Sequence, residues 1–226
     1  MRVLAIDTAL GACAAAIYDS DHGVVMAQES REMTRGHAEA LMPMIARVMD
    51  AAMFEFAELD RVAVTVGPGS FTGLRVGLSA ARGIALAAGR PAVGVSTLAA
   101  YAAPAISADK TQTIIAAIDA RHAQVFIQIF GPGGRTLAAA RQAKLSEGLP
   151  AIEGPVHLVG SAAEAIAQAW PADAAPPSIT SSRSAPDIEW VAKLGVVADT
   201  RSAPPNPLYL RPPDAQPQHA ARLPRQ

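Results

Sequence analysis

Cysteine is nearly absent from this sequence, and Cys13 is its single residue of this type. One cysteine excludes an internal disulfide and any metal site built from several cysteines, and it is typical of a reducing compartment. Long apolar runs are also lacking, because no segment reaches the roughly 18 unbroken apolar residues of a membrane-spanning helix. The apolar run at the N-terminus is too short for a signal peptide and is interrupted by Asp7. We therefore expect a cytoplasmic protein without a membrane contact.

An excess of charge of either sign is missing as well. The 19 lysines and arginines nearly balance the 20 aspartates and glutamates, so no overall field draws the chain to nucleic acid or to an anionic membrane. Any contact with RNA would need a local patch or a partner. Apolar residues are abundant instead: they make up 50% of the 226 residues, and the mean hydropathy is +0.21. This composition argues against disorder and provides one large core or two small ones.

The first hundred residues alternate between strand and helix signals. Three short strands come first, then a helix, a strand, a second helix and a strand, at residues 3–6, 13–18, 24–28, 36–56, 62–66, 74–88 and 92–95. Residues 116–131 then repeat the pattern of residues 4–19, in which a strand ends in an aspartate and a turn leads to a second strand. Two copies of this pattern suggest a duplication.

The signals weaken after residue 131. We expect a strand at 156–159, helices at 162–170 and 187–197, and a loop rich in proline and serine at 171–186. Seven of the 18 prolines lie in the last 26 residues. The tail from residue 203 is therefore predicted to be extended or disordered and to carry little information on the fold.

The segment GPGSFTGLRVG, residues 67–77, follows an apolar strand and precedes a helix. A glycine-rich turn at this place can bind an anion, because backbone N–H groups and the helix dipole point at the ligand. A Walker loop needs lysine and a hydroxyl residue after its last glycine, whereas Gly73 is followed by Leu74 and Arg75. The dinucleotide fingerprint fails because Thr72 stands at the third glycine position. A tight structural connection and a ligand loop both stay open.

Six segments together resemble one protein family. They are LAIDTA at residues 4–9, HAEALMPMI at 37–45, GPGSFTGLRVGLSAARGIAL at 67–86, GVSTLAA at 94–100, AAIDAR at 116–121 and PLYLR at 207–211. The chain resembles the sugar kinase and actin (ASKHA) superfamily. More narrowly it is similar to the TsaB (YeaZ) family, the non-catalytic paralogues of the TsaD enzymes that make threonylcarbamoyladenosine in tRNA.

The resemblance implies an α/β fold of two RNase H/actin-like subdomains. Each would contain a mixed five-stranded type of sheet with helices, and the C-terminal one would be degenerate. The implied boundaries are residues 1–100 for the N-terminal subdomain, 101–202 for the C-terminal subdomain and 203–226 for a proline-rich tail.

The resemblance also indicates which chemistry has been lost. TsaD-like enzymes carry V-N-H-M-E-G-H, whose two histidines bind a metal, where this chain has Thr97 and Tyr101. Neither replaces neutral imidazole at a divalent metal. We therefore expect no cofactor, with metal and nucleotide carried by the partner. A relict nucleotide loop, kept as a structural turn with at most weak nucleotide contact, is expected at Asp7, Thr8, Gly67, Gly69, Ser70 and Thr72.

A methionine-rich helix is the remaining unusual feature. Five of the seven methionines lie between Met33 and Met53, and the apolar residues of the segment 39–56 cover more than one stripe. Burial by its own sheet and by helix 74–88 is one explanation. The resemblance favours another, because TsaB-like proteins pair with TsaD through these helices. The expected interface residues are Leu41, Met42, Ile45, Val48, Met49 and Met53.

The predicted function is a scaffold and activator that dimerises with a TsaD-type enzyme and enables threonylcarbamoyl transfer to the adenosine next to the anticodon in tRNA. A TsaE-type ATPase is expected to join the pair, tRNA to bind only through the complex, and homodimers to use the same surface.

Three alternatives belong to other classes of function. Asp7 and Asp119 could act as paired acids in an ATPase or kinase cleft. Cys13 with His122 and Asp119 could form a peptidase that acts on the TsaD-type partner. A stand-alone homodimeric binding protein is the third alternative. His37 and Glu39 do not add a fourth as a metal pair, because two positions apart at a helix start they are expected to point to different faces.

Overall fold

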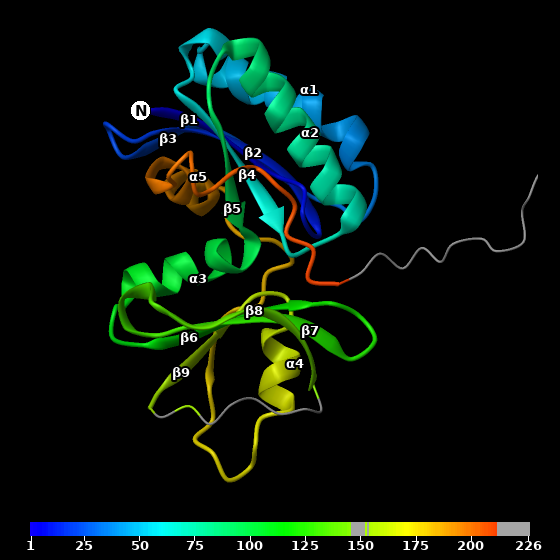
Figure 1. Cartoon of the computed structure of the whole chain (residues 1–226), viewed down its shortest axis with the longest axis vertical. Coiled ribbons are helices and arrows are strands. Elements are labelled where there is room, and N and C mark those ends of the chain that lie inside the picture. The colour runs from blue at the N-terminus through cyan, green and yellow to red at the C-terminus, as the bar shows by residue number, and fades with distance from the viewer. Residues whose placement is uncertain (146–151, 153, 212–226) are drawn as a thin grey trace, which may run out of the picture.

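The first half of the molecule is built on a five-stranded sheet, which lies in the upper part of Figure 1. The structure is a computed structural model that describes residues 1–145, 152 and 154–211. The sheet contains β1 (Arg2–Asp7), β2 (Ala12–Asp19), β3 (Val24–Glu32), β4 (Arg61–Gly67) and β5 (Ala92–Ser96) in the order β3-β2-β1-β4-β5. The first three strands form an antiparallel meander, and β4 and β5 add in parallel.

Helices cover both faces of this sheet. Helices α1 (His37–Ala52) and α2 (Phe71–Ala88) enclose the largest apolar cluster on one face, and α5 (Ile188–Val197) packs on the other. The side chain of Ser70 caps α2 by accepting a hydrogen bond from the Gly73 N–H, and Gly89 ends α2 in the left-handed conformation. The predicted end of the first helix at residue 56 is wrong, because Met53 adopts the left-handed conformation and a 3-10 turn, η1 (Phe56–Glu58), follows.

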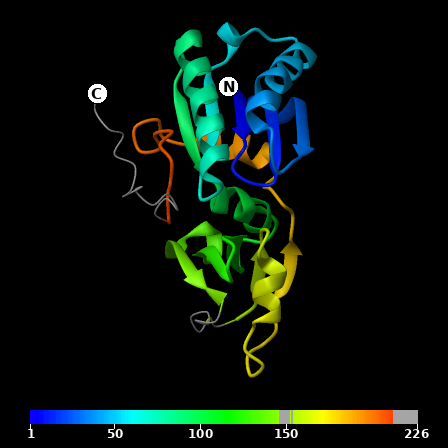
Figure 2. The same cartoon turned by 90° about the vertical axis from the view of Figure 1, so that its right-hand side faces the viewer.

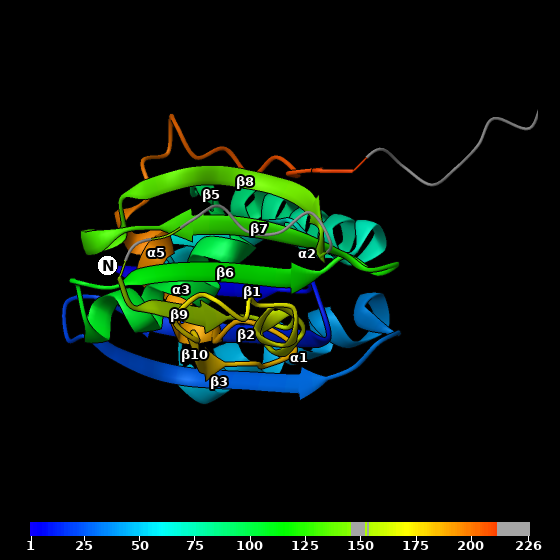
Figure 3. The ribbon, with the colours of Figure 1, turned by 90° about the horizontal axis from the view of Figure 1, so that it is seen from below.

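The second half contains another five-stranded sheet, whose strands lie side by side in Figure 3. Its strands are β6 (Thr113–Asp119), β7 (Gln124–Phe130), β8 (Thr136–Lys144), β9 (Val156–Val159) and β10 (Ser178–Ser181) in the order β10-β9-β6-β7-β8. Helix α3 (Thr97–Ala108) packs on the face toward the first half, and α4 (Ala163–Gln168) packs on the outer face. A 3-10 turn, η2 (Pro132–Gly134), connects β7 to β8.

The two sheets repeat one topology. In each, a meander of three antiparallel strands is followed by two parallel strands on the other side of the first strand. The predicted fold class, an α/β protein with two mixed five-stranded sheets, is therefore confirmed. The sequence did not predict α3 or β8, and β10 lies inside the segment expected to be a loop. Within the described residues no helix is long and apolar enough to cross a membrane.

The last part of the chain returns to the first half. Helix α5 packs against β1 and β4, and Arg61 of β4 donates hydrogen bonds to three carbonyls at the end of that helix. Residues 203–211, here named the C-terminal strap, then run along the first half toward the second (Figure 2). The predicted boundary places α5 in a C-terminal subdomain of residues 101–202, whereas α5 packs on the sheet of the first half. Residues 212–226 of the predicted tail lie outside the described residues.

Candidate functional site

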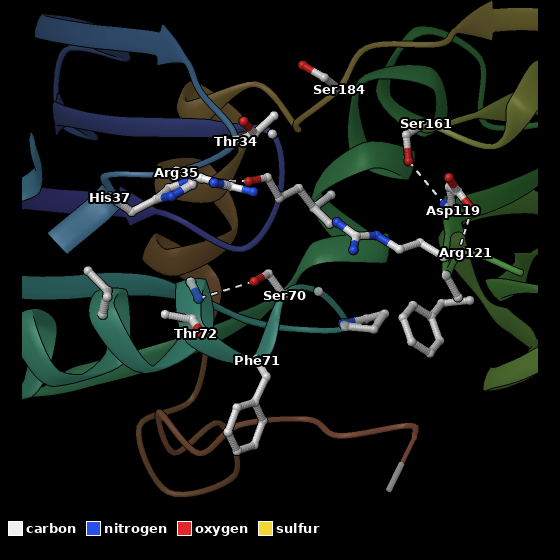
Figure 4. A pocket seen from close by; sticks show the side chains of 18 of the residues that line it. Thr34, Arg35, His37, Ser70, Phe71, Thr72, Asp119, Arg121, Ser161 and Ser184 are labelled. Atoms are coloured by element: carbon white, nitrogen blue, oxygen red, sulfur yellow. Dashed lines mark hydrogen bonds between the residues drawn. The ribbon is translucent and has the colours of Figure 1, made fainter. Parts of the chain in front are cut away.

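A cleft of about 980 Å³ opens between the two halves. Its lining comes mainly from the β1–β2 turn, the loop that leads into α1, the glycine-rich loop before α2, the β6–β7 turn and the C-terminal strap, with Ser161 and Ser184 from two further loops. The turns that follow the first strand of each sheet thus meet at one cavity, which is the place where the sequence predicted a relict nucleotide site. Figure 4 shows the side chains that point into it.

The glycine-rich loop is packed against the chain itself. A Cβ atom on Gly69 would lie 2.4 Å from the Ala9 carbonyl oxygen, and one on Gly73 would lie 2.1 Å from that of Thr8. The Ser70 N–H donates to the Ala9 carbonyl over 2.7 Å. These glycines therefore permit a close approach of two backbone segments. The part of the loop that a phosphate would need is filled by residues 8–9.

Two predicted loop residues, Asp7 and Thr8, are buried. The Asp7 carboxylate accepts hydrogen bonds from Thr65 Oγ1 over 2.6 Å and from the Ala9 N–H over 3.0 Å, while its other oxygen has no hydrogen-bond partner. Burial raises the pKa of Asp7, and the Thr65 and Ala9 bonds oppose this. The Thr8 hydroxyl donates to the Gly73 carbonyl over 2.7 Å. The Asp7 side chain thus joins the turn to β4, and the Thr8 side chain joins it to α2. Thr72 lines the cleft at the helix start.

The C-terminal strap accounts for two further glycines. A Cβ on Gly67 would lie 2.8 Å from the Leu208 carbonyl oxygen, and one on Gly94 would lie 2.8 Å from that of Pro204. Backbone bonds join Leu208 N–H to Val66 and Gly94 N–H to the Ala203 carbonyl. The strap is therefore a fixed part of the first half, in contrast to the expectation that the tail carries little fold information.

The two positions that correspond to metal ligands do not suit a metal. Tyr101 is buried and donates its hydroxyl proton to the Arg183 carbonyl over 2.9 Å, and burial raises the pKa of this phenol. Thr97 is fully buried, and its hydroxyl has no partner within the described residues. A neutral phenol and a threonine hydroxyl are poor ligands for a divalent ion. Across the described part of the chain no three His, Cys, Asp or Glu side chains gather as a metal site would require.

The β6–β7 turn has an unusual backbone. Arg121, His122 and Ala123 all have positive φ angles, of 63°, 52° and 55°, although none of them is glycine. This conformation costs about 1–2 kcal/mol per residue. Asp119 accepts the Arg121 N–H over 2.7 Å, and Ser161 Oγ accepts the Asp119 N–H over 3.1 Å. The turn holds the Arg121 side chain in the cleft, where Figure 4 shows it reaching toward the centre.

The residues proposed for a peptidase have different surroundings. Cys13 is completely buried in the core beneath α1, and burial raises the pKa of its thiol to about 11. A thiolate is the reactive form of cysteine, so this side chain is a poor nucleophile. His122 is exposed on the β6–β7 turn. The geometry therefore gives no support to a Cys13 nucleophile.

His37 and Glu39 both line the cleft. The bend at Gly36, with φ of 85°, begins α1 at the wall of the cleft. His37 Nε2 lies 3.2 Å from the Leu10 carbonyl oxygen, so this ring bridges the start of α1 and the β1–β2 turn. Arg35, one residue before the bend, lines the same wall.

A second hollow, of about 520 Å³, lies between α1 and α2. We name it the helix groove; its lining residues are Ala38, Leu41, Met42, Phe71, Thr72, Arg75, Val76, Ser79 and Ala80. Exposed apolar side chains occur on the same two helices and at their ends. Met42 is 49% exposed, Met53 86% and Leu86 85%.

Most of the predicted interface residues face the wrong way for a partner. Four of them are buried in the core between α1 and the first sheet: Leu41, Ile45, Val48 and Met49. The physical reason is that the apolar stripe of α1 is wide enough to contact both the sheet and α2. Met42 and Met53 remain exposed. The predicted interface did not include Phe71, which lines the helix groove, or Leu86, which is exposed on α2.

Comparison with known proteins places this architecture in a family. The model of the family described as "TsaD: tRNA N6-adenosine threonylcarbamoyltransferase" matches residues 24–198. The chain belongs to the TsaD family. A TsaB protein of Escherichia coli, named for tRNA threonylcarbamoyladenosine biosynthesis, is 38% identical over 126 residues, which are 56% of this chain and 53% of the relative. The chain thus spans about half the length of that relative.

Two other proteins match over nearly the full chain. An uncharacterised protein of Mycobacterium tuberculosis is 35% identical over 219 residues, 95% of this chain and 94% of the relative. A Pseudomonas aeruginosa crystal structure, described as similar to the peptidase YeaZ, superposes with a TM-score of 0.78 at 26% identity over 93% of this chain and 99% of that one. The resemblance to TsaB and YeaZ inferred from the motifs is confirmed.

Proposed function

We propose that this chain is a non-catalytic subunit that pairs with a TsaD-type enzyme in the synthesis of threonylcarbamoyladenosine in tRNA. The partner would transfer the threonylcarbamoyl group to the adenosine next to the anticodon, with its own metal and nucleotide. Support comes from the family, from Thr97 and Tyr101 at the metal positions, and from the self-filled glycine loop.

The helix groove is the proposed docking surface for the TsaD-type enzyme. It lies on the first half, where α1 and α2 leave Met42, Met53 and Leu86 exposed to solvent. Covering such side chains contributes about 1.5–3 kcal/mol each before the costs of association. A TsaE-type ATPase would join the pair, tRNA would bind through the complex, and a second copy of this chain could occupy the same groove when the enzyme is absent.

Two substitutions test this proposal, one in the groove at Met42 and one outside its lining at the exposed Leu86 of α2. Met42→Glu and Leu86→Glu place a charge on exposed positions of α1 and α2, so the fold should remain and the 1:1 complex with the TsaD-type enzyme of the same organism should be lost. Val197→Glu is the matched control, because Val197 is 77% exposed on α5. Light scattering after size-exclusion chromatography measures the complex. If the Met42→Glu and Leu86→Glu variants both still elute with the enzyme, the docking surface is wrong. If the parent chain does not elute with the enzyme, the proposed pairing is wrong.

A further inference from the structure

Two arginines face each other across the mouth of the cleft. Arg35 belongs to the loop that leads into α1 in the first half, and Arg121 belongs to the β6–β7 turn of the second half. Neither guanidinium has an ion pair or a hydrogen bond within the described residues. Figure 4 shows their side chains coming from opposite walls. An anion in the mouth would therefore meet positive charge from both halves, and Arg211 of the strap is a third arginine in the cleft lining.

Part of the glycine-rich loop at the floor of the cleft is already in contact with the chain itself. The Ser70 N–H is bonded to the Ala9 carbonyl, and the glycines at positions 69 and 73 are pressed against residues 8–9. The phosphates of a free nucleotide would thus lack the backbone cradle that such a loop provides in phosphate-binding proteins. The phosphates of an RNA strand that crosses the mouth of the cleft can be bound by the arginine side chains without this backbone cradle.

An aromatic pair lies at the same mouth. The rings of Phe71 and Tyr209 are 5.2 Å apart, and the Arg75 guanidinium lies 3.8 Å from the centre of the Phe71 ring. Phe71 is 39% exposed and Tyr209 42%, so both rings present apolar surface to solvent. Exposed aromatic rings beside basic groups are the features by which proteins bind single-stranded nucleic acid, because bases stack on the rings.

Two carboxylates, Glu39 and Asp119, also line the cleft. Asp119 accepts the N–H of Arg121 and so lies at the base of the turn rather than beside its guanidinium. These charges restrict the place of a phosphate to the outer part of the mouth. The site therefore fits one or two phosphates and one stacked base, which is a local contact of a larger RNA rather than a complete binding groove.

We propose that the cleft mouth binds a single-stranded segment of the tRNA, with phosphates on Arg35 and Arg121 and a base stacked on the Phe71–Tyr209 pair. This inference rests on the proposed function, because the proposed complex acts on tRNA. The RNA contact gives the second half of the molecule a role, because Arg121 belongs to that half. The helix groove lies on the first half alone.

The experiment measures tRNA affinity of the 1:1 complex by fluorescence anisotropy at several salt concentrations. The double variant Arg35→Gln/Arg121→Asn removes both charges, and asparagine tolerates a positive φ at position 121. We expect affinity to fall about tenfold and the slope of log affinity against log salt to decrease by about 1.4, since each single-strand phosphate contact contributes about 0.7. Tyr209→Ala should weaken binding about fivefold with an unchanged slope.

Controls separate this proposal from the pairing itself. Arg201→Ala removes an exposed arginine that does not line the cleft, and its tRNA affinity should equal that of the parent. Size-exclusion chromatography shows whether each variant still pairs with the enzyme, as expected for residues outside the helix groove. If neither the parent chain nor any variant pairs with the enzyme, the same titrations on the isolated protein test the RNA contact separately from the pairing. Unchanged tRNA affinity of the double variant, or its loss of Mg-ATP binding instead, overturns the proposal.

Discussion

The two halves of the molecule share a strand order but differ in what covers it. In the first half, residues 33–60 connect β3 to β4 and include the 16-residue helix α1, while α2 has 18 residues. In the second half, the corresponding connection is only residues 145–155, and α4, the counterpart of α2, has 6 residues. The comparison teaches that the proposed docking surface depends on the added helix α1 and on the greater length of α2, since the sheet topology is present twice.

The largest expected difference between variants, that between packed and open glycine positions, concerns a close contact that both halves use. A Cβ on Gly73 would lie 2.1 Å from the Thr8 carbonyl oxygen, and a Cβ on Gly160 would lie 2.2 Å from that of Ala117. Replacing either glycine by alanine should lower the free energy of unfolding by about 3 kcal/mol, because backbone atoms must move. Urea denaturation measures the change.

Gly83 provides the control for this prediction. It lies in α2, and nothing is within 4 Å of the Cβ that it would gain. Gly83→Ala should raise the free energy of unfolding by about 0.5–1 kcal/mol, since alanine favours the helix. Equal stability of all three variants would contradict the view that the glycine positions are set by packing.

A smaller difference is expected between the two cores. Ile45 of α1 and Ile166 of α4 are 0% and 2% exposed. Truncation of Ile45 to alanine should cost about 4 kcal/mol, because α1 is held between the sheet and α2 and cannot collapse onto the cavity, whereas Ile166→Ala should cost about 2 kcal/mol in the short α4. Thermal and urea unfolding measure both. A lower cost at Ile45 would show that α1 is loosely packed and would reopen this position as a partner contact.

The smallest effect separates the two strand-end aspartates. The pKa of Asp7 is raised by burial, so the folded state holds the proton more tightly than the unfolded state. Between pH 3.8 and the folded pKa the parent chain therefore loses stability as pH rises, and above it the loss is complete. Asp7→Asn lacks this loss, so its stability relative to the parent should increase from pH 4 to pH 8 in urea titrations.

Asp119 is the comparison for that titration, because it is exposed. Asp119→Asn keeps an oxygen that accepts the Arg121 N–H, so its stability should stay within about 0.5 kcal/mol of the parent. A pH-independent difference between Asp7→Asn and the parent would contradict the role assigned to burial.

Much of this fold follows from local sequence pattern. The apolar runs of β1 and β4 and the alanine-rich α2 were predicted because their signals are continuous. The strand β8, TLAAARQAK, was missed because alanine, lysine and glutamine favour strands poorly, and its pairing with β7 decides its conformation. Helix α3 was missed although Ser96 caps it, since its sequence contains Pro104 and has no clear apolar stripe.

The candidate site was harder to predict because it depends on contacts between distant residues. Composition and spacing marked Gly67 and Gly69 as unusual, but only the structure shows that Leu208 and Ala9 lie against them. The Met-rich helix was correctly singled out as apolar on more than one side, whereas the choice of exposed residues failed because periodicity does not say which side meets the sheet. Arg121 gave no signal, since its place in the cleft depends on the turn.

The position of α5 in the chain affects how the protein is made. The face of the first sheet that contains Val3 and Ala5 is covered by Ile188 and Val191, which are synthesised after the whole second half. A ribosome therefore releases the first five strands long before their cover exists, and apolar surface on that face stays in contact with water or with a chaperone during the interval. The residues translated first are among the last to be buried.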